Sequence, residues 1–539
     1  MVPVHLSALN TAASRYSELP AFKLPQTDLE GRVTQWSVVT YRQFQDDVNR
    51  FARHWADRLL MDGVCPKSVV GLWLSGMAYT DVLHIYGLSK AGYIPQLCSL
   101  RLDNADIIYQ LLHHSAAKAL IVDPSKATSL SSSPVPVYHA ITTEEAALSS
   151  PFSLPEFADP LPSDTALIFH TSGSTSGSPK LVPCSYRWLK SMFDKSYQVL
   201  HPKSSVRKDV ISWMGSMCHI AQNFMLSGAL QHGSCFVQPT TLDFSSQELV
   251  EMVKQCDLNR LNLFATYLSR HIRAARTDCA LSQMLSGLDQ LLSTGLPLPR
   301  EDEEWAYSNG LPLRNVFGNT ECGGMLLSVG SDEPQENCNP RLLRSLDGMA
   351  YSFVPIDQPH NTETSHQSTT RMLELVVCAN SLDCPDESLC GADGCFRTGD
   401  LFNEVKPGHY IFRGRNDDWI KSENSLRCDT RAIEDNVRAT CAHLISDCVV
   451  VGSGRPSPVL FVEPLDEAAN PTKLSREIIS RTRQFHVRRY IHERITSPDM
   501  VLIVRPGSLP RTATKGNIRR QLIEEEYKDR LDTIFAKRR

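Results

Sequence analysis

The amino-acid sequence predicts a doubly wound α/β protein followed by a second, smaller α/β unit. Three observations support this fold class. Amphipathic helical segments alternate with short β-rich apolar runs before residue 130, and the alternation resumes after residue 165. The 539 residues are too many for one hydrophobic core. From about residue 418 the composition shifts, and a further set of short strands and a basic helix follows.

The N-terminal segments show the alternation most clearly. Residues 41–59 form an expected helix, because their apolar side chains fall on one face. These side chains are Phe44, Val48, Phe51, Ala52 and Trp55. Residues 69–74 and 119–123 are apolar and read as buried strands, and residues 80–92 between them read as a helix that ends at a glycine.

The middle of the chain continues the pattern after an interruption. Residues 125–165 are rich in serine and proline, so we expect a surface connection there. A strand at 166–170 leads into a Gly/Ser-rich loop, and a helix is expected near 186–199. Residues 356–370 are polar and read as an exposed loop.

The C-terminal unit has its own set of elements. Residues 447–452, 459–464 and 500–506 read as strands, and the basic segment 481–495 reads as a helix. We expect the boundary between the two units at Asn416–Asp418.

Composition excludes several classes of function. The 42% hydrophobic and 21% charged residues are typical of a globular protein. A formal charge of -5 argues against a nucleic acid or an anionic membrane surface as partner. The sequence has no apolar run of roughly 18–20 residues that would cross a bilayer, no secretory-signal pattern and no peroxisomal tripeptide. We therefore expect a cytoplasmic enzyme without a membrane span.

The 16 cysteines do not suggest a metal centre. No Cys-x-x-Cys pair is present, and the densest group is spaced more widely than zinc ligands usually are. This group is Cys378, Cys384, Cys390 and Cys395. We interpret these residues as reduced thiols in a loop, as expected for a cytosolic protein.

Five separated segments carry residues suited to chemistry. They are HTSGSTSGSPK (170–180), NVFGNTECGG (315–324), FRTGDL (396–401), FRGRNDDWIK (412–421) and LPRTATKGNIRR (509–520). The first can cradle phosphate oxygens through backbone N–H groups and hydroxyls, with Lys180 adding positive charge. Its spacing does not match a P-loop. Thr320 and Glu321 can supply a phosphate hydrogen bond and a magnesium ligand, and Asp400 can accept two ribose hydroxyls. Taken singly, each segment is better explained as a turn or a helix cap than as a site.

Taken together and in this order, the five segments resemble the signature motifs of the adenylate-forming superfamily. That superfamily includes acyl- and aryl-CoA synthetases, adenylation domains of nonribosomal peptide synthetases, and luciferases. The resemblance covers nearly the whole chain. It implies a large N-terminal domain (1–416) of doubly wound sheets with a small β-barrel-like part, and a small mobile α+β domain (417–539).

The resemblance also implies roles for individual residues. ATP and Mg²⁺ are the implied cofactors, and a carboxylic acid is the implied substrate. Phe317 stands at the adenine-stacking position, Asn319 and Thr320 at nucleotide-contacting positions, Glu321 at the magnesium ligand, and Asp400 at the ribose ligand. Arg415 lies beside the hinge, Asp417 is the hinge, and Lys515 is the mobile catalytic lysine. The phosphate loop comprises Thr171, Ser172, Gly173, Ser174, Thr175, Ser176, Gly177 and Lys180.

Three segments depart from the family pattern. The phosphate loop is one residue longer than usual, which changes the register of Lys180. The C-terminal loop reads Thr-Lys-Gly, an order that we associate with adenylation domains of fungal synthetase-like reductases. Ser425 stands where the family usually has a glycine on the loop lining the pantetheine tunnel, so the fit of CoA is in question.

The substrate is expected to be a non-amino carboxylic acid. Adenylation domains for α-amino acids place an aspartate in the segment that matches MCHIAQNF, and here Ile220 stands there. A buried, unpaired substrate ammonium would be costly. His219 matches the family's gate beside the acid pocket and is a candidate catalytic residue; the alternative is a histidine packed in the core.

Three hypotheses of function are compatible with these motifs, and the first two differ in the thiol acceptor. The first hypothesis is an acyl- or aryl-CoA ligase, and the second is a free-standing enzyme that loads a phosphopantetheinyl carrier protein of a secondary-metabolite synthase. The third is a non-catalytic nucleotide-binding protein with the same fold. No carrier or reductase segment follows residue 539 in this sequence, so we expect the acceptor to be a separate molecule.

Overall fold

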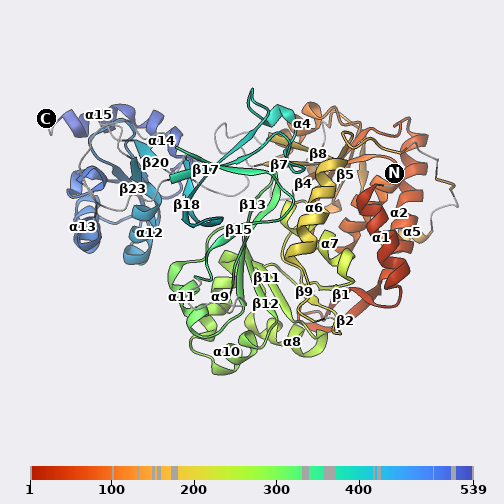
Figure 1. Cartoon of the computed structure of the whole chain (residues 1–539). Coiled ribbons are helices and arrows are strands. Elements are labelled where there is room, and N and C mark those ends of the chain that lie inside the picture. The colour runs from red at the N-terminus through yellow and green to blue at the C-terminus, as the bar shows by residue number, and fades with distance from the viewer. Residues whose placement is uncertain are drawn as a thin grey trace.

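The computed structural model has a large N-terminal body and a smaller C-terminal one, which lie at opposite sides of Figure 1. It describes residues 3–99, 102, 104–130, 133–148, 152–154, 159–171, 180–204, 206–330, 339–356, 372–416, 419–421, 427–487, 489, 491–511 and 518–536. In these ranges, none of the helices combines the length and the apolar character needed to cross a bilayer.

A six-stranded sheet forms one half of the N-terminal body. Its order is β6-β5-β3-β4-β7-β8, and all neighbours are parallel except β7 and β8. The strands are β3 (Val69–Leu74), β4 (Ile94–Ser99), β5 (Ala119–Val122), β6 (Val137–His139), β7 (Thr165–Thr171) and β8 (Lys180–Ser185). Successive side chains of β3 point to opposite faces of the sheet, so Leu72 and Trp73 are buried in two different hydrophobic cores. This is expected for a sheet that is covered on both faces.

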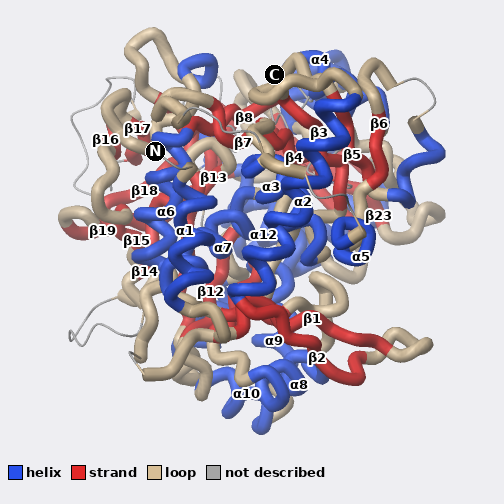
Figure 2. Tube along the Cα trace, turned by 90° about the vertical axis from the view of Figure 1, so that its right-hand side faces the viewer, coloured by secondary structure: helices blue, strands red, loops and turns tan. Residues whose placement is uncertain are grey.

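Helices cover both faces of this sheet. On one face α2 (Tyr41–Met61) and α3 (Tyr79–Lys90) pack together with β3 and β7, and Figure 2 shows them beside these strands. On the other face α4 (Ala105–His114) packs against Trp73 and Leu120. Helix α2 begins at a capping box in which Thr40 and Gln43 bond each other's backbone N–H groups.

A thirteen-stranded sheet forms the other half. Its parallel part is β10-β9-β11-β12-β13, and an antiparallel part of six strands follows, ordered β14-β15-β19-β18-β17-β16. The parallel strands are β9 (Val210–Ser212), β10 (Cys235–Val237), β11 (Arg260–Phe264), β12 (Gln290–Thr294) and β13 (Leu313–Asn319). The antiparallel strands are β14 (Gly323–Ser328), β15 (Leu343–Ser345), β16 (Tyr351–Pro355), β17 (Met372–Val377), β18 (Phe396–Lys406) and β19 (His409–Arg415).

The remaining strands of this sheet form a hairpin at its other edge. β1 (Pro20–Thr27) pairs in parallel with β10 and antiparallel with β2 (Val33–Thr40). Helices α8 (Ser246–Cys256), α9 (Ala265–Ala275), α10 (Cys279–Ser286) and α11 (Arg300–Ser308) connect or flank the parallel strands, and much of their apolar surface joins one core.

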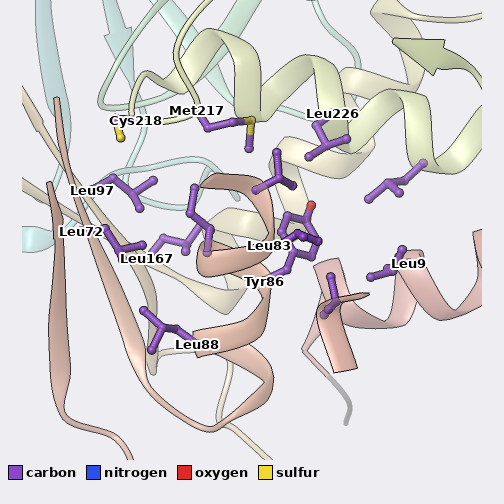
Figure 3. Packing of buried hydrophobic residues seen from close by; sticks show 14 of the residues in the cluster. Leu9, Leu72, Leu83, Tyr86, Leu88, Leu97, Leu167, Met217, Cys218 and Leu226 are labelled. Carbon is purple, nitrogen blue, oxygen red and sulfur yellow. The ribbon is translucent and has the colours of Figure 1, made fainter. Parts of the chain in front are cut away.

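Two helices fill the space between the sheets. Helix α7 (Ile220–His232) is buried on almost every side, and α6 (Tyr186–Val199) packs beside it. Figure 3 shows Leu226 of α7 and Met217 just before it facing Leu83 and Tyr86 of α3. The N-terminal helix α1 (Val4–Arg15) closes this core through Leu6 and Leu9.

The C-terminal body is a small α+β unit. Its three-stranded sheet has the order β22 (Ile445–Val451), β23 (Val459–Pro464) and β24 (Val501–Ile503), and β20 (Trp419–Lys421) pairs with β21 (Arg427–Asp429). Its helices are α12 (Thr430–Cys441), α13 (Pro471–Val487), α14 (Arg520–Glu526) and α15 (Lys528–Ala536). The predicted fold class, a large α/β body followed by a smaller α+β unit, is confirmed. The part expected to be β-barrel-like is the antiparallel run β14-β15-β19-β18-β17-β16, which continues the thirteen-stranded sheet.

Two local predictions need correction. The described part of residues 125–165 is a mostly exposed connection, as expected, but it also holds a strand, β6, and the short helix α5 (Thr143–Ala147). Tyr138 of β6 and Ala146 of α5 are buried, so part of the segment belongs to the sheet and its core. The basic helix begins at Pro471 and ends at Val487, because Leu474 and Ile478 supply buried positions upstream of the expected start. The loop expected at 356–370 lies almost wholly outside the described residues.

A buried tyrosine connects α2 to the end of α7. The Tyr41 hydroxyl donates to the backbone oxygen of Ser234 at 2.6 Å, and the side chain is 1% exposed. We expect Tyr41→Phe to lower the free energy of unfolding by about 1–2 kcal/mol, because a buried carbonyl loses its donor. Urea denaturation measures this change. Tyr197→Phe is the control, since Tyr197 is 46% exposed; equal effects of the two substitutions would contradict the expectation.

Candidate functional site

A tight turn between β13 and β14 presents Thr320 and Glu321. The side-chain oxygen of Asn319 accepts a hydrogen bond from the backbone N–H of Cys322 at 2.8 Å, which closes the turn. A Cβ on Gly318 would lie 2.2 Å from the carbonyl oxygen of the facing strand, so glycine is required for this close approach. Thr320 and Glu321 are half-buried, so they stand on a fixed backbone at the edge of the core.

One face of α6 supports this turn. Trp188 Nε1 donates to the backbone oxygen of Glu321 at 2.9 Å. Gly323 has φ +70°, and a Cβ there would lie 2.2 Å from the sulfur of Met192. Trp188 and Met192 are four residues apart on the helix and therefore point the same way. The turn thus rests directly on α6.

The same helix face carries a buried lysine. Lys195 is 0% exposed, and its Nζ donates to the backbone oxygen of Cys322 at 2.5 Å and to Asp383 Oδ2 at 2.7 Å. Asp383 is also 0% exposed and accepts hydrogen bonds from the hydroxyls of Tyr351 and Ser381. The ammonium charge is therefore neutralised inside the core, and the carboxylate is satisfied.

A cluster of three phenylalanines connects β13, the strand before the turn, to the antiparallel strands β18 and β19. Phe317 on β13 lies edge-on to Phe402 on β18, with ring centroids 5.1 Å apart, and 5.2 Å from the ring of Phe412 on β19. Phe317 is half-buried. Its ring is thus fixed by packing while part of it stays accessible.

Asp400 lies on β18 two residues before Phe402 and is 4% exposed. It pairs across the ladder with Arg415 on β19, and Arg415 Nη1 is 3.5 Å from Asp400 Oδ1. Gly399 has φ +72°, and its N–H is bonded to Glu374 at 3.2 Å, which shapes the backbone just before Asp400. The structure therefore places Phe317, Thr320 and Glu321 on β13 and its turn into β14, and Asp400 and Arg415 on β18 and β19. Both strand pairs belong to one sheet, with β15 between them.

His219 is both a packed residue and a helix cap. It precedes α7, where its Nδ1 accepts from the backbone N–H of Ala221 at 3.3 Å, and its ring lies edge-on to Phe264 at 5.6 Å. The ring of Phe264 also fills the space beside Gly215 and Gly295, where a Cβ would approach it to 2.9 Å. Both interpretations of His219 agree with this geometry.

The described ends of the phosphate loop are Thr171 and Lys180, which face each other across the β7–β8 ladder. The loop residues Ser172, Gly173, Ser174, Thr175, Ser176 and Gly177 lie outside the described residues. His170, just before them, makes no hydrogen bond of normal geometry through its ring within the described part of the chain. Burial lowers the pKa of His170 to about 4, and the Thr171 backbone offsets only part of this effect.

Lys515 and Asp417, the residue expected to be the hinge, also lie outside the described residues. The two ends of the segment that contains Lys515 are well anchored. Arg511 pairs with Ile518 as a β-bridge and forms ion pairs with Asp447 at 2.8 Å and Glu463 at 2.6 Å. The base of this loop is therefore fixed to β22 and β23.

The cysteine group forms a thiol pair. Cys384 Sγ and Cys390 Sγ are 3.7 Å apart, and Cys378 lies 3.3 Å from the Ser352 hydroxyl. Burial raises the pKa of Cys384 to about 12 and also raises that of Cys390, so both thiols stay protonated at neutral pH. Across the described ranges, no group of three or more His, Cys, Asp or Glu side chains is arranged to hold a metal ion.

Sequence reasoning missed the residues that support the turn. Trp188, Met192, Lys195 and Asp383 belong to no motif. The one available signal was a lysine at helical spacing from a tryptophan and a methionine, on a face that is otherwise apolar. Phe264 carried no signal, because its role depends on which glycines lie beside it in three dimensions.

Family models match both parts of the chain. Residues 9–348 match the model of the AMP-binding enzymes, and residues 417–539 match the model of the AMP-binding enzyme C-terminal domain. The chain belongs to the AMP-binding enzymes, within the adenylate-forming superfamily. The family assignment made from the five motifs is therefore confirmed.

Relatives of this AMP-binding enzyme include fungal proteins. It is 33% identical over 519 residues to the AMP-binding domain-containing enzyme iboA of Amanita muscaria, covering 94% of this chain and 98% of that one. It is 22% identical to the adenylate-forming reductase Nps10 of Heterobasidion annosum, covering 92% of this chain but 47% of the relative. The fold is similar to that of O-succinylbenzoate CoA synthetase from Bacillus subtilis in complex with ATP and a magnesium ion, with a TM-score of 0.71, 16% identity and coverage of 96% and 99%.

The low pKa of His170 has a measurable consequence. Its pKa is lowered from 6.5 to about 4 in the folded protein. As the pH falls below 6.5, His170 becomes protonated in the unfolded chain but stays neutral in the folded protein. The free energy of unfolding therefore decreases on acidification. Between pH 7.5 and pH 5 this one group should cost about 2 kcal/mol.

We therefore expect His170→Phe to lose about 2 kcal/mol less stability than the wild type over that pH range, measured by urea denaturation. The control is His113→Gln on an exposed position of α4. If His170→Phe and His113→Gln show the same pH dependence, His170 does not stay neutral in the folded protein.

Proposed function

We propose that this enzyme activates a non-amino carboxylic acid with ATP, forming an acyl-adenylate and pyrophosphate, and then transfers the acyl group to a thiol, in the first instance CoA. The observation that carries the proposal is the Thr320–Glu321 turn, held on α6 and joined through Phe317 to the strand that bears Asp400. Membership in the AMP-binding enzymes supports the proposal, because this arrangement offers an aromatic ring, a hydroxyl group and carboxylates, which are suited to binding a nucleotide.

The described residues fit an adenine nucleotide. Phe317 offers an aromatic ring fixed against two others, suited to stacking on a base. Asp400 is a buried carboxylate that can accept two ribose hydroxyls, and Arg415 beside it supplies a positive charge. Asn319 and Thr320 lie at the start of the turn and would contact the nucleotide, and the segment from Thr171 to Lys180 would close over the outer phosphates.

The residues present also fit a magnesium ion carried by the nucleotide. Mg²⁺ in such sites is held by one or two carboxylates together with substrate phosphates, rather than by a cage of protein ligands. Glu321 provides one carboxylate on a fixed turn, which agrees with the lack of a three-ligand cluster in the described ranges. The ion would neutralise phosphate charge in the transition state.

The chemistry follows from these charges. A carboxylate oxygen of the acid attacks the α-phosphorus, the bond to the bridging oxygen breaks, and pyrophosphate leaves. Two anions must approach each other, so catalysis needs positive charge and orientation rather than a base. Lys515 is proposed to supply that charge. In the second step the thiol sulfur attacks the acyl carbon, AMP leaves, and the thiol proton passes to solvent.

Residues 417–539 are proposed to be the mobile unit that separates the two steps, with Asp417 as the hinge. In one orientation the unit would present Lys515, and in the other it would present the loop around Ser425. Asp417, Lys515 and Ser425 all lie outside the described ranges, so this part of the proposal rests on the family model that matches residues 417–539.

The acid pocket is proposed to lie at the N-terminus of α7. The segment from Gly215 to Phe224 contains no acidic residue, and Ile220 is buried in the core. A substrate ammonium would have no partner from this segment and would be costly to bury. His219 and Phe264 would form one wall of the pocket.

A second candidate acceptor is a phosphopantetheinyl carrier protein of a secondary-metabolite synthase. The observation that favours it is the similarity to Nps10, of which this chain spans about half. The adenylation step is the same for both acceptors, and they differ only in the molecule that carries the thiol. We place both reactions in the cytoplasm.

Acid-dependent exchange of labelled pyrophosphate into ATP tests the proposal, over a panel of carboxylic acids that includes amino acids and their desamino analogues. We expect exchange with a non-amino acid, and thioester formation when CoA is added. Glu321→Gln should lower exchange by roughly 10²-fold, because a magnesium ligand is lost. The matched control is Glu303→Gln, outside the turn.

Three results would contradict parts of this proposal. No exchange with any acid, in protein that binds ATP, would favour the non-catalytic nucleotide-binding alternative. A preference for an amino acid over its desamino analogue would show that the pocket is misassigned. Thioester formation on a carrier protein and not on CoA would select the second acceptor.

Lys515 and Asp417 should affect different half-reactions. Lys515→Ala should lower adenylation by roughly 10²–10³-fold but spare thioester formation from a synthetic acyl-adenylate, because its charge is needed only in the first step. Asp417→Pro should impair the second step, since proline restricts φ and prevents rotation. Single-turnover assays of each half-reaction measure both.

Lys528→Ala, at an exposed position of α15, is the control. Equal losses in both half-reactions would contradict a rotating domain. Normal adenylation by Lys515→Ala would assign the role to another lysine, with Lys421 the nearest alternative among the motifs.

A further inference from the structure

Three consecutive backbone positions of the turn are fixed by three side chains of α6. Trp188 bonds the oxygen of residue 321, Lys195 bonds the oxygen of residue 322, and Met192 packs where residue 323 would carry a Cβ. These side chains stand at i, i+4 and i+7, which is one face of a helix. All three are at most 2% exposed.

We propose that Lys195, neutralised by Asp383, is a positioning residue: it holds the backbone of the Thr320–Glu321 turn in register with the strand that carries Asp400. The inference deepens the proposed function and rests on it. Lys195 would touch neither the nucleotide nor the acid, because it is fully buried beneath the turn.

The backbone oxygen of Cys322 in the turn needs a hydrogen-bond donor. Cys322 is fully buried, so its carbonyl oxygen cannot be satisfied by bulk water. The ammonium of Lys195 reaches it at 2.5 Å, and a charged donor bonds more strongly than a neutral one. A lysine in the core is nevertheless stable only beside an opposite charge, and Asp383 supplies it at 2.7 Å.

Asp383 extends the connection to the antiparallel part of the sheet. It accepts from the hydroxyl of Tyr351 on β16, and from Ser381, whose hydroxyl oxygen also accepts from the backbone N–H of Ala350 at 2.9 Å. Strand β16 pairs with β17, and β17 pairs with β18, the strand of Asp400. Lys195 is thus bonded directly to the turn and is connected, through Asp383, Tyr351 and the paired strands β16, β17 and β18, to the strand of Asp400.

Two other ion pairs serve as controls, because they distinguish a positioning role at the turn from a general contribution to stability. Arg260 and Asp209 form a pair that is equally buried, at 2.7 Å, but Arg260 bonds the backbone at the C-terminal end of α6 instead of the turn. Lys190 and Asp194 form an exposed pair on α6 itself, also at 2.7 Å. Removing the Arg260–Asp209 pair shows the effect of a less stable core. Removing the Lys190–Asp194 pair shows the effect of changing the charges on α6.

The test compares the variant Lys195→Met/Asp383→Asn with Asp209→Asn and with Lys190→Met/Asp194→Asn. The first removes the donor without leaving a buried charge unpaired, so it should fold. Calorimetry then measures binding of adenosine and of MgATP, and hydrogen exchange follows the peptide 319–325. We expect MgATP affinity to fall by roughly 10–100-fold with adenosine binding within about two-fold of wild type, as for loss of a residue that orients a metal ligand. The exchange of that peptide should become faster.

The two controls should leave MgATP affinity and the exchange of this peptide unchanged, although Asp209→Asn should lower thermal stability. If Lys195→Met/Asp383→Asn binds MgATP like the wild type, or loses adenosine and MgATP affinity equally, the positioning role is wrong. If wild-type protein binds MgATP no more tightly than adenosine, the proposed function fails, and this inference fails with it.

Discussion

The buried ion pair between Lys195 and Asp383 is the interaction on which the rest of the site depends. It places a charged donor under a turn whose own carbonyl would otherwise be unsatisfied in the core. Because both partners are fully buried, removing either one alone would leave an uncompensated charge, a change that typically costs about 3–5 kcal/mol. The turn that bears Glu321 is therefore part of the core, although its side chains reach the surface.

This arrangement explains why the site lies where two kinds of sheet meet. The parallel strands end at β13, and the turn after it begins the antiparallel part. Phe317 contributes to both parts through Phe402 and Phe412, so the proposed base-stacking ring and the proposed ribose carboxylate share one aromatic cluster. A nucleotide bound there would be held by strands from both, while the small C-terminal unit would contribute Lys515.

The sequence predicted the family and most of the secondary-structure elements well. It did not predict the contacts that support the Thr320–Glu321 turn. The helix expected near 186–199 is α6 with those bounds, and the strands at 69–74 and 459–464 are also as predicted, because local periodicity determines them. The strand β6 within residues 125–165 was not predicted, since its pairing with β5 is a tertiary contact. Lys195 and Asp383 are 188 positions apart, so no local pattern could relate them. The motifs supplied Glu321 and Asp400, but the bonds that position the turn came only from the structure.

The most direct test of this account is a double-mutant cycle between Glu321→Gln and Lys195→Met/Asp383→Asn, read as the free energy of MgATP binding. If the ion pair acts by positioning Glu321, its removal should weaken binding in the wild-type background and have little further effect once Glu321 is changed. The account predicts this non-additivity. An equal loss of affinity in both backgrounds would contradict it, because the pair would then act independently of the turn.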